Sequence, residues 1–266
     1  MNPQELESAR DVMLTAAREA GEILLSYYGR LDATRIGRKS SVRDLVTEAD
    51  VASERHLVQR LRKALPSHAI EAEEEVRDAM GDPDQPRWFL DPLDGTVNFV
   101  HSLPMFAVSA GLWIGDQPKV AVVHLPLLGE TFHAIHGAGA FLGEAPISVS
   151  DTSQLSEAIL ATGFPYRRGE LEHDNLENFN AFFYEQRGIR RMGSAAIDLA
   201  YTAAGRLDGY WELHLSPHDV AAGGLLVQEA GGLVSDAAGG RDWLRGGTLV
   251  AAGPGLHELI RDRIVS

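Results

Sequence analysis

The second half of the chain, from Asp151 onward, alternates short apolar runs with amphipathic stretches, and this alternation strongly limits the folds available to it. Helices are expected near residues 175–186, 194–204, 217–230 and 255–264, and strands at residues 158–162, 208–213, 233–235 and 248–252. Strands that alternate with helices are typical of layered α/β structure, in which helices cover the faces of a sheet. The pattern therefore predicts an α/β half over residues 151–266.

The first half of the chain shows a different order of patterns. Apolar residues recur at helical spacing from Leu6 to Tyr27, and a second helical pattern runs from Thr47 to Leu65, with Thr47 and Asp50 spaced as a capping box. From Trp88 the pattern changes to strands, which include a hairpin of residues 119–125 and 130–136 and a further strand at 147–149. These patterns predict an N-terminal α+β half over residues 1–150, with helices on an antiparallel sheet. Because no Ser- or Pro-rich linker separates the halves, we expect them to pack together.

Composition excludes several classes of function. The chain has 24 Lys+Arg against 38 Asp+Glu, and its net charge of −14 opposes direct binding to nucleic acid or to an anionic membrane. It contains no cysteine, which removes disulfides, thiolate metal sites and a cysteine nucleophile. The N-terminal residues do not have the pattern of a secretory signal, and no apolar stretch approaches the roughly 18 residues of a membrane span. We therefore expect a cytoplasmic protein.

The segment WFLDPLDGTVNFVH, residues 88–101, carries the most specific chemistry. Asp91 ends an apolar run, Pro92 turns the chain away, and Asp94 follows three residues after Asp91. Two carboxylates at this spacing converge on one divalent cation, and Gly95 and Thr96 leave backbone N–H groups beside them for phosphate oxygens. A hard cation next to such amides is a layout for phosphoryl chemistry. Taken alone, however, DPLDG is equally consistent with a plain turn.

Two further acidic segments have simple structural interpretations when each is taken alone. EAEEEV, residues 71–76, is typical of a solvated charge run. Ser216, Pro217 and Asp219 have the spacing of a helix N-cap with its first and third helical residues, so capping without chemistry explains them.

Together these segments resemble the inositol monophosphatase family of Mg²⁺-dependent, lithium-sensitive phosphatases, most closely its bacterial members. The resemblance covers nearly the whole chain, through DLVTEAD, DPLDGTVNF, ATGFPYR, RRMGSAAIDLAYTAAGRLDGYWE and HDVAAGGLLVQEAGG. The family signature Asp-Pro-x-Asp-Gly-Thr-x-Asn-Phe is complete at residues 91–99. The resemblance implies a five-layered α/β/α/β/α sandwich of the type shared with fructose-1,6-bisphosphatase, and a homodimer.

The resemblance also implies two to three Mg²⁺ ions in each active site. Glu73, Asp91 and the backbone carbonyl of Leu93 would bind the first ion, and Asp91, Asp94 and Asp219 the second, while Glu73 would hold a looser third ion through water. Such clustering of acids needs cations, because two carboxylates about 4 Å apart repel by roughly 4 kcal/mol at an effective dielectric constant of 20.

The implied reaction is phosphomonoester hydrolysis by a metal-activated water. Asp50 and Thr96 resemble the family's pair that orients this water and takes its proton, with Glu74 in support. The backbone amides of Gly95 and Thr96 would hold the phosphate oxygens during in-line displacement.

The resemblance assigns the hydroxyls of the substrate to Glu212, the Ser194-Ala195 backbone and one oxygen of Asp94, with Arg191 nearby. From the residues alone, Glu212 is simply an exposed strand carboxylate, and Arg191 is equally consistent with a surface ion pair or an interface residue. We expect inositol monophosphate, or another small phosphorylated polyol or sugar, as the substrate. Fructose-1,6-bisphosphate and histidinol phosphate are alternatives from the same class of hydrolase.

Two residues depart from the family pattern, and one alternative function is of a different class. His218 stands where the family has tryptophan before Asp219, and Ala72 stands where it has glycine before Glu73, so metal affinity is expected to differ. Because some bacterial relatives associate with the transcription machinery, the alternative is a regulatory protein that binds it.

Overall fold

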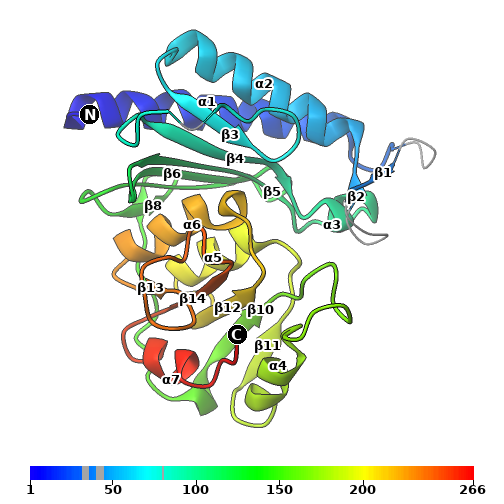
Figure 1. Ribbon diagram of the computed structural model, residues 1–266, viewed down its shortest axis with the longest axis vertical. Coiled ribbons are helices and arrows are strands. Elements are labelled where there is room, and N and C mark those ends of the chain that lie inside the picture. The colour runs from blue at the N-terminus through cyan, green and yellow to red at the C-terminus, as the bar shows by residue number, and fades with distance from the viewer. Residues whose placement is uncertain (32–35, 40–44, 80) are drawn as a thin grey trace.

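The computed structural model describes residues 1–31, 36–39, 45–79 and 81–266. Two β-sheets and three layers of helices alternate along its long axis (Figure 1). Helices α1 (Pro3–Tyr27) and α2 (Glu48–Ala64) cover the outer face of the larger sheet, and α5 (Ala195–Ala203) and α6 (Pro217–Glu229) lie between the sheets. On the outer side of the smaller sheet lie α4 (Leu176–Phe182) and α7 (His257–Arg261). The expected α/β/α/β/α sandwich is therefore confirmed.

The two outer helices begin as their sequences predict. Asn2 caps α1, and Thr47 caps α2 through a capping box in which Asp50 bonds back to the Thr47 backbone. The buried face of α2 includes Leu57 and Leu61, which are fully inaccessible to solvent. No helix in the described ranges is long and apolar enough to cross a membrane.

The larger sheet has seven strands in chain order and is antiparallel apart from its first pair, β3 with β4. Its strands are β3 (Ala69–Ala72), β4 (Arg87–Asp94), β5 (Ala107–Ile114), β6 (Gln117–Leu125), β7 (Glu130–Ile135), β8 (Ala140–Leu142) and β9 (Ala145–Pro146). The predicted hairpin is present as β6 and β7. The strand expected at 147–149 is absent, because the Val149 N–H bonds to the carbonyl of Ala230 at the end of α6 instead of to a neighbouring strand.

The smaller sheet has the order β11-β10-β12-β14-β13, with β10 parallel to both neighbours and β14 antiparallel to both of its own. Its strands are β10 (Ile159–Thr162), β11 (Gly188–Arg190), β12 (Gly209–Leu213), β13 (Leu233–Ser235) and β14 (Thr248–Ala252). The shorter elements are β1 (Gly37–Arg38) paired with β2 (Leu45–Val46), α3 (Thr96–Val100) and a 3₁₀ turn at Leu155–Glu157.

Helix α6 joins the two sheets through small residues. A Cβ atom at Gly111 of β5 would lie 2.6 Å from the backbone of Ala221, so the helix packs directly on the larger sheet. One apolar core includes side chains from both sheets, such as Phe89 and Leu249, together with α6. The division into halves at residues 150 and 151 stays an interpretation, because this core is continuous across it. The packing places Asp219, in the first turn of α6, close to the end of β4.

Candidate active site

The DPLDG segment forms a corner between β4 and α3. Strand β4 continues past Pro92, with a shift of register against β5 between Asp91 and Asp94, so the expectation that Pro92 stops the strand is wrong. The Asp91 carboxylate is buried and accepts a hydrogen bond of 2.9 Å from the Leu93 N–H. Gly95 has a φ of +96°, and a Cβ there would lie 2.8 Å from the Met105 carbonyl oxygen. Only glycine suits this corner, which presents Asp91, Asp94 and Thr96 together.

Asp50 and Thr96 meet although 46 residues separate them. The Thr96 hydroxyl lies 3.1 Å from Asp50 Oδ1 and 3.1 Å from the Leu93 carbonyl oxygen. The N–H and hydroxyl of Thr47 donate to Asp50 Oδ2 at 2.8 and 2.6 Å, which fixes the carboxyl at the start of α2. Burial raises the pKa of Asp50 to about 6, despite these stabilising bonds. The contact places a carboxyl and a hydroxyl, a pair able to pass a proton, beside the DPLDG corner.

Four carboxyl groups lie near this corner, and the negative charge of each makes ionisation of its neighbours less favourable. Burial raises the pKa of Asp91 well above its usual value, and Glu73, Asp94 and Asp219 raise it further. The pKa of Asp219 is likewise raised by burial, with Asp94 and Glu73 adding to the effect. Burial raises the pKa of Asp94 to about 6, although Ser194 Oγ and the Ala196 N–H each donate to its Oδ2 at 2.7 Å. Burial without a compensating cation therefore disfavours the charged state of Asp91, Asp94 and Asp219.

The chemistry of this donor set fits a hard divalent cation, because every donor is an oxygen. The carboxyls of Asp91, Asp94 and Asp219 are close enough to affect one another's ionisation. In the described ranges, however, no three acidic or histidine side chains are arranged closely enough to hold a metal ion as they stand. The structure brings these acids into one neighbourhood without forming a complete coordination shell.

The acidic loop after β3 is held in place, unlike the solvated charge run that its sequence suggests when taken alone. Glu54 of α2 is fully buried and accepts hydrogen bonds of 2.7, 2.7 and 2.9 Å from the N–H groups of Glu74, Glu75 and Val76. Lys39 Nζ lies 2.7 Å from Glu73 Oε1 and also pairs with Glu74. Burial raises the pKa of Glu74 to about 7, with Lys39 opposing the shift. No local pattern in the sequence distinguishes Lys39 or Glu54 from ordinary charged residues.

A cavity of about 390 Å³ opens beside the acid cluster and contains most of the expected substrate residues. Its lining includes Glu73, Asp94, Arg191, Ser194, Ala195, Glu212 and Asp219, together with part of the ATGFPYR segment. The Glu212 carboxyl lies directly against Gly163, where an added Cβ would be only 2.0 Å from Oε2, and it accepts a hydrogen bond of 2.6 Å from the Tyr210 hydroxyl. Burial raises the pKa of Glu212 to about 7. From the residues alone, Glu212 was expected to be an exposed carboxylate on a strand. In the structure it instead forms part of the cavity wall.

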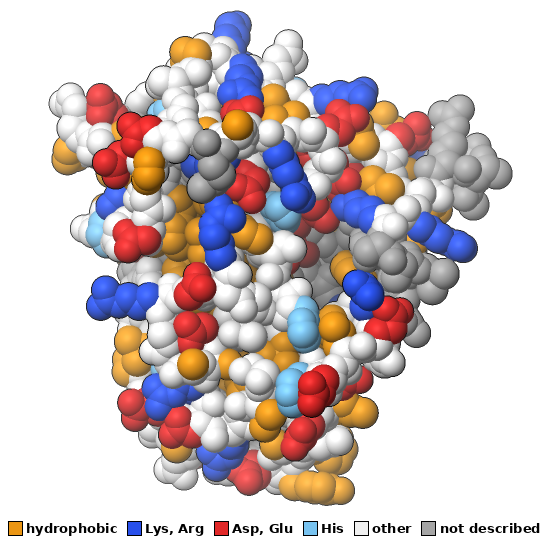
Figure 2. All heavy atoms as spheres, viewed as in Figure 1, with side chains coloured by type: hydrophobic (Ala, Val, Ile, Leu, Met, Phe, Trp, Pro, Cys, Tyr) orange, Lys and Arg blue, Asp and Glu red, His pale blue; other side chains and the backbone are white. Residues whose placement is uncertain are grey.

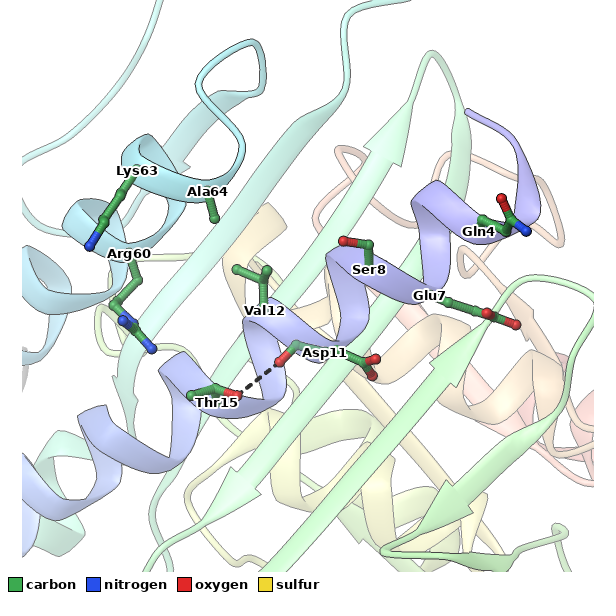
Figure 3. Close-up of a pocket in the computed structure, with 9 residues that line it drawn as sticks. All are labelled: Gln4, Glu7, Ser8, Asp11, Val12, Thr15, Arg60, Lys63 and Ala64. Carbon is green, nitrogen blue, oxygen red and sulfur yellow. Dashed lines mark hydrogen bonds between the residues drawn. The ribbon is translucent and has the colours of Figure 1, made fainter.

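A larger groove lies elsewhere on the molecule. It has a volume of about 720 Å³ and is formed by α1 and α2, with Gln4, Asp11 and Thr15 on one helix and Arg60 and Lys63 on the other (Figure 3). None of the sequence-predicted site residues lines it. The smaller cavity, by contrast, is lined by seven of them.

His218 is buried in the first turn of α6. Its Nδ1 has no hydrogen-bond partner among the described residues, and burial lowers its pKa, which favours the neutral ring. Ala72 is fully buried in β3. Both residues are therefore buried, and His218 lies in the helical turn that carries Asp219.

The net charge of −14 is not displayed as a single acidic face in the view of Figure 2, where acidic and basic side chains are interspersed. Several acids instead lie inside the molecule, including Asp50, Glu54 and Asp91, each at most 2% exposed. Part of the negative charge is thus concentrated at the candidate site.

The structure is a layered α/β sandwich with buried acids at the β4–α3 corner and a polar cavity beside them. These features are consistent with a metal-dependent phosphatase, and comparison with known families supports that class. The model of the inositol monophosphatase family matches residues 5–266, and the chain belongs to this family. The resemblance seen in the sequence is confirmed.

Individual relatives carry two kinds of name. The chain is 45% identical over 246 residues to "Nus factor SuhB" of Pseudomonas aeruginosa, covering 91% of this chain and 90% of the relative. It is 42% identical over 244 residues to the protein of the same name from Escherichia coli K12, covering 92% and 91%. Among solved structures, the inositol monophosphatase of Anabaena sp. PCC 7120 superposes with a TM-score of 0.88 at 38% identity, covering 97% of this chain and 96% of that one. The extragenic suppressor protein SuhB of Bartonella henselae superposes with a TM-score of 0.89 at 37% identity, covering 95% and 96%.

Proposed function

We propose that the chain is a Mg²⁺-dependent phosphomonoesterase that hydrolyses inositol monophosphate to myo-inositol and phosphate. The observation that carries the proposal is the position of Asp94 and Asp219, which belong to the buried acid cluster and also line the cavity that contains Glu212 and Arg191. A phosphate bound at the cluster would have its esterified alcohol inside this cavity. Membership of the inositol monophosphatase family supports the type of reaction.

In this proposal the metal ligands are Glu73, Asp91, the Leu93 carbonyl, Asp94 and Asp219, for two to three Mg²⁺. Bound there, Mg²⁺ supplies the positive charge that a phosphate ester needs and favours ionisation of an attacking water. The ligands themselves come from β4, α6 and the loop held by Glu54, so three elements converge on one phosphate site.

Proton transfer falls to Asp50 and Thr96. A water that donates to the Thr96 hydroxyl delivers its proton to Asp50 Oδ1 through the contact of 3.1 Å between them. The pKa of Asp50, about 6, is close enough to neutrality for a general base. Glu74 supports this arrangement from the acidic loop, and the N–H groups of Gly95 and Thr96 hold the phosphate oxygens.

Recognition of the alcohol is assigned to Glu212, Arg191 and the Ser194-Ala195 segment. We predict that Glu212→Gln raises KM for myo-inositol 1-phosphate about tenfold, the effect of losing a charge-assisted hydrogen bond to a hydroxyl. KM for p-nitrophenyl phosphate, which lacks those hydroxyls, is expected to change less than twofold. Steady-state kinetics with both substrates measure the difference, and equal effects would remove Glu212 from the substrate contacts.

The same acid cluster is equally suited to other small phosphate esters, so fructose-1,6-bisphosphate and histidinol phosphate remain alternative substrates. Phosphate release across a panel of these esters ranks them.

We also propose a cytoplasmic homodimer. Exposed apolar side chains on and beside α4 support the dimer, since Leu176, Phe183 and Tyr184 are 53%, 52% and 91% exposed. Light scattering after size exclusion tests it.

A regulatory role is the second candidate, and the name "Nus factor" of the relatives favours it. The net charge of −14 favours a protein partner in the transcription machinery over direct contact with RNA. Binding to RNA polymerase that persists in Asp91→Asn would support a role separate from hydrolysis. No binding by either form would argue against it.

A further inference from the structure

Asn175 is a buried polar residue close to the candidate active site but outside the lining of its cavity. It precedes α4, is 2% exposed and has a φ of +74°, in the left-handed region that asparagine tolerates better than most residues. Its sequence context predicts only a helix start. Its contacts reach two strands of the smaller sheet.

The Asn175 side chain joins the ends of β10 and β12. Its Nδ2 donates to Thr162 Oγ1 at 2.8 Å and to the Gly163 carbonyl oxygen at 2.6 Å. Its Oδ1 accepts from Trp211 Nε1 at 2.9 Å. The Thr162 hydroxyl in turn donates to the Trp211 carbonyl oxygen at 2.7 Å, which closes a small network between the two strands.

The residues that follow on these strands form the cavity wall. Gly163 follows Thr162, Glu212 follows Trp211, and the two are in direct contact because the Glu212 carboxyl occupies the space of the missing Gly163 side chain. The Glu212 carboxyl therefore packs against Gly163 on one side, while the Tyr210 hydroxyl donates to it at 2.6 Å.

The other side of Asn175 is anchored by α4 and the C-terminal segment. Asn178 Nδ2 donates to Asn175 Oδ1 at 3.1 Å and to the Val265 carbonyl oxygen at 2.9 Å, while the Val265 N–H donates to Asn178 Oδ1 at 2.8 Å. Figure 1 shows α4, β10 and the C-terminus in the same part of the molecule. With two donated and two accepted bonds, Asn175 uses the full hydrogen-bonding capacity of its amide.

We propose that Asn175 is a positioning residue of the candidate active site, which holds Gly163 against Glu212 and so directs the Glu212 carboxyl into the cavity. The inference rests on the proposed function in one respect, that Glu212 contacts a hydroxyl of the substrate. Among the described residues, the Asn175 side chain bonds to none of the carboxyls of the acid cluster, so its effect is specific to the alcohol side of the cavity.

The test is Asn175→Gly, since glycine adopts a φ of +74° without strain and only the side-chain bonds are lost. We expect KM for myo-inositol 1-phosphate to rise about tenfold, with kcat and the kinetics toward p-nitrophenyl phosphate within twofold of the parent. In a double variant with Glu212→Gln, the two effects should not add, because both act through one carboxyl. Ser235→Ala is the matched control, since it removes a buried hydroxyl of β13 that bonds to His257 of α7, and KM should not change.

Equal losses toward both substrates, or additive effects in the double variant, would overturn the proposal. If Asn175→Gly does not fold, Asn175→Asp keeps the shape of the side chain but removes the amide that donates to Thr162 and to the Gly163 carbonyl, and it should raise the same KM. If the parent protein hydrolyses no phosphate monoester, the proposed function fails. The positioning role is then judged from a crystal structure of Asn175→Gly. Displacement of Glu212 from Gly163 is the expected result, and an unchanged contact would contradict it.

Discussion

Replacement of Asp91 by asparagine is expected to lower Mg²⁺-dependent phosphate release on the order of a thousandfold while the protein stays folded. Asp91 is 2% exposed, and its burial, together with the nearby Glu73, Asp94 and Asp219, raises its pKa well above the usual value. It is also the one residue assigned to both principal metal sites. A neutral amide keeps the shape of the side chain and removes the charge that a cation needs.

Stability separates this loss from misfolding. Because Asp91 is repelled by its neighbours when no cation is present, Asp91→Asn should have a Tm without Mg²⁺ equal to or above that of the parent. Asp116→Asn makes the same chemical change at an exposed turn between β5 and β6 and should keep full activity. Near-normal turnover of Asp91→Asn would show that the acid cluster is not the catalytic centre.

The metal-free protein is expected to lose stability as the pH rises from 7 to 8.5. The pKa values of Asp91 and Asp219 are raised well above normal, and those of Glu74 and Glu212 are raised to about 7, chiefly by burial. In the unfolded chain these carboxyls are already ionised at pH 7, so over this range the folded state binds more protons than the unfolded state. The free energy of unfolding therefore falls with pH, by up to about 1.4 kcal/mol per pH unit for each carboxyl still protonated in the folded state.

Thermal unfolding in EDTA should show this as a Tm that falls by several degrees between pH 7 and pH 8.5. The buried histidines contribute little over this range, because burial lowers the pKa of residues such as His124 and His218 and keeps them neutral in the folded state. Mg²⁺ should reverse the loss, since a bound cation favours the ionised carboxyls and stabilises the folded state. Asp91→Asn, with one carboxyl fewer, should show a shallower slope and a smaller response to Mg²⁺. A Tm in EDTA that is constant or rises over this range would contradict the account of the cluster.

The sequence predicts most of the α/β half because most of its elements carry their own local pattern, although it does not indicate β11 and overestimates the length of α4. Strands β13 and β14 begin and end at the expected residues, and α6 at Pro217 follows its N-cap signal. Strand β5 was missed, since seven of its eight residues are buried and the alternation of polar and apolar residues that marks a half-exposed strand is absent. Pro92 suggested the end of β4, yet the strand accommodates it at a change of register.

The sequence identifies those candidate site residues that lie together in one segment. It does not identify the residues that reach the site only through contacts between distant segments. Asp91, Asp94 and Thr96 stand together in the sequence and at one corner of the structure. Glu54 looks like an ordinary charged residue on a helix, and only folding shows it buried and bonded to the acidic loop. Lys39 and Asn175 likewise acquire their contacts from residues far along the chain, which no local pattern records.

We propose that the acid cluster and the cavity together hydrolyse a small phosphate monoester. This is tested by phosphate release from myo-inositol 1-phosphate by the purified protein, with Mg²⁺, with EDTA, and with Mg²⁺ plus millimolar Li⁺. Release is expected to require Mg²⁺ and to be inhibited by Li⁺. Absence of release with Mg²⁺, from this ester and from the panel of alternatives, would contradict the proposal.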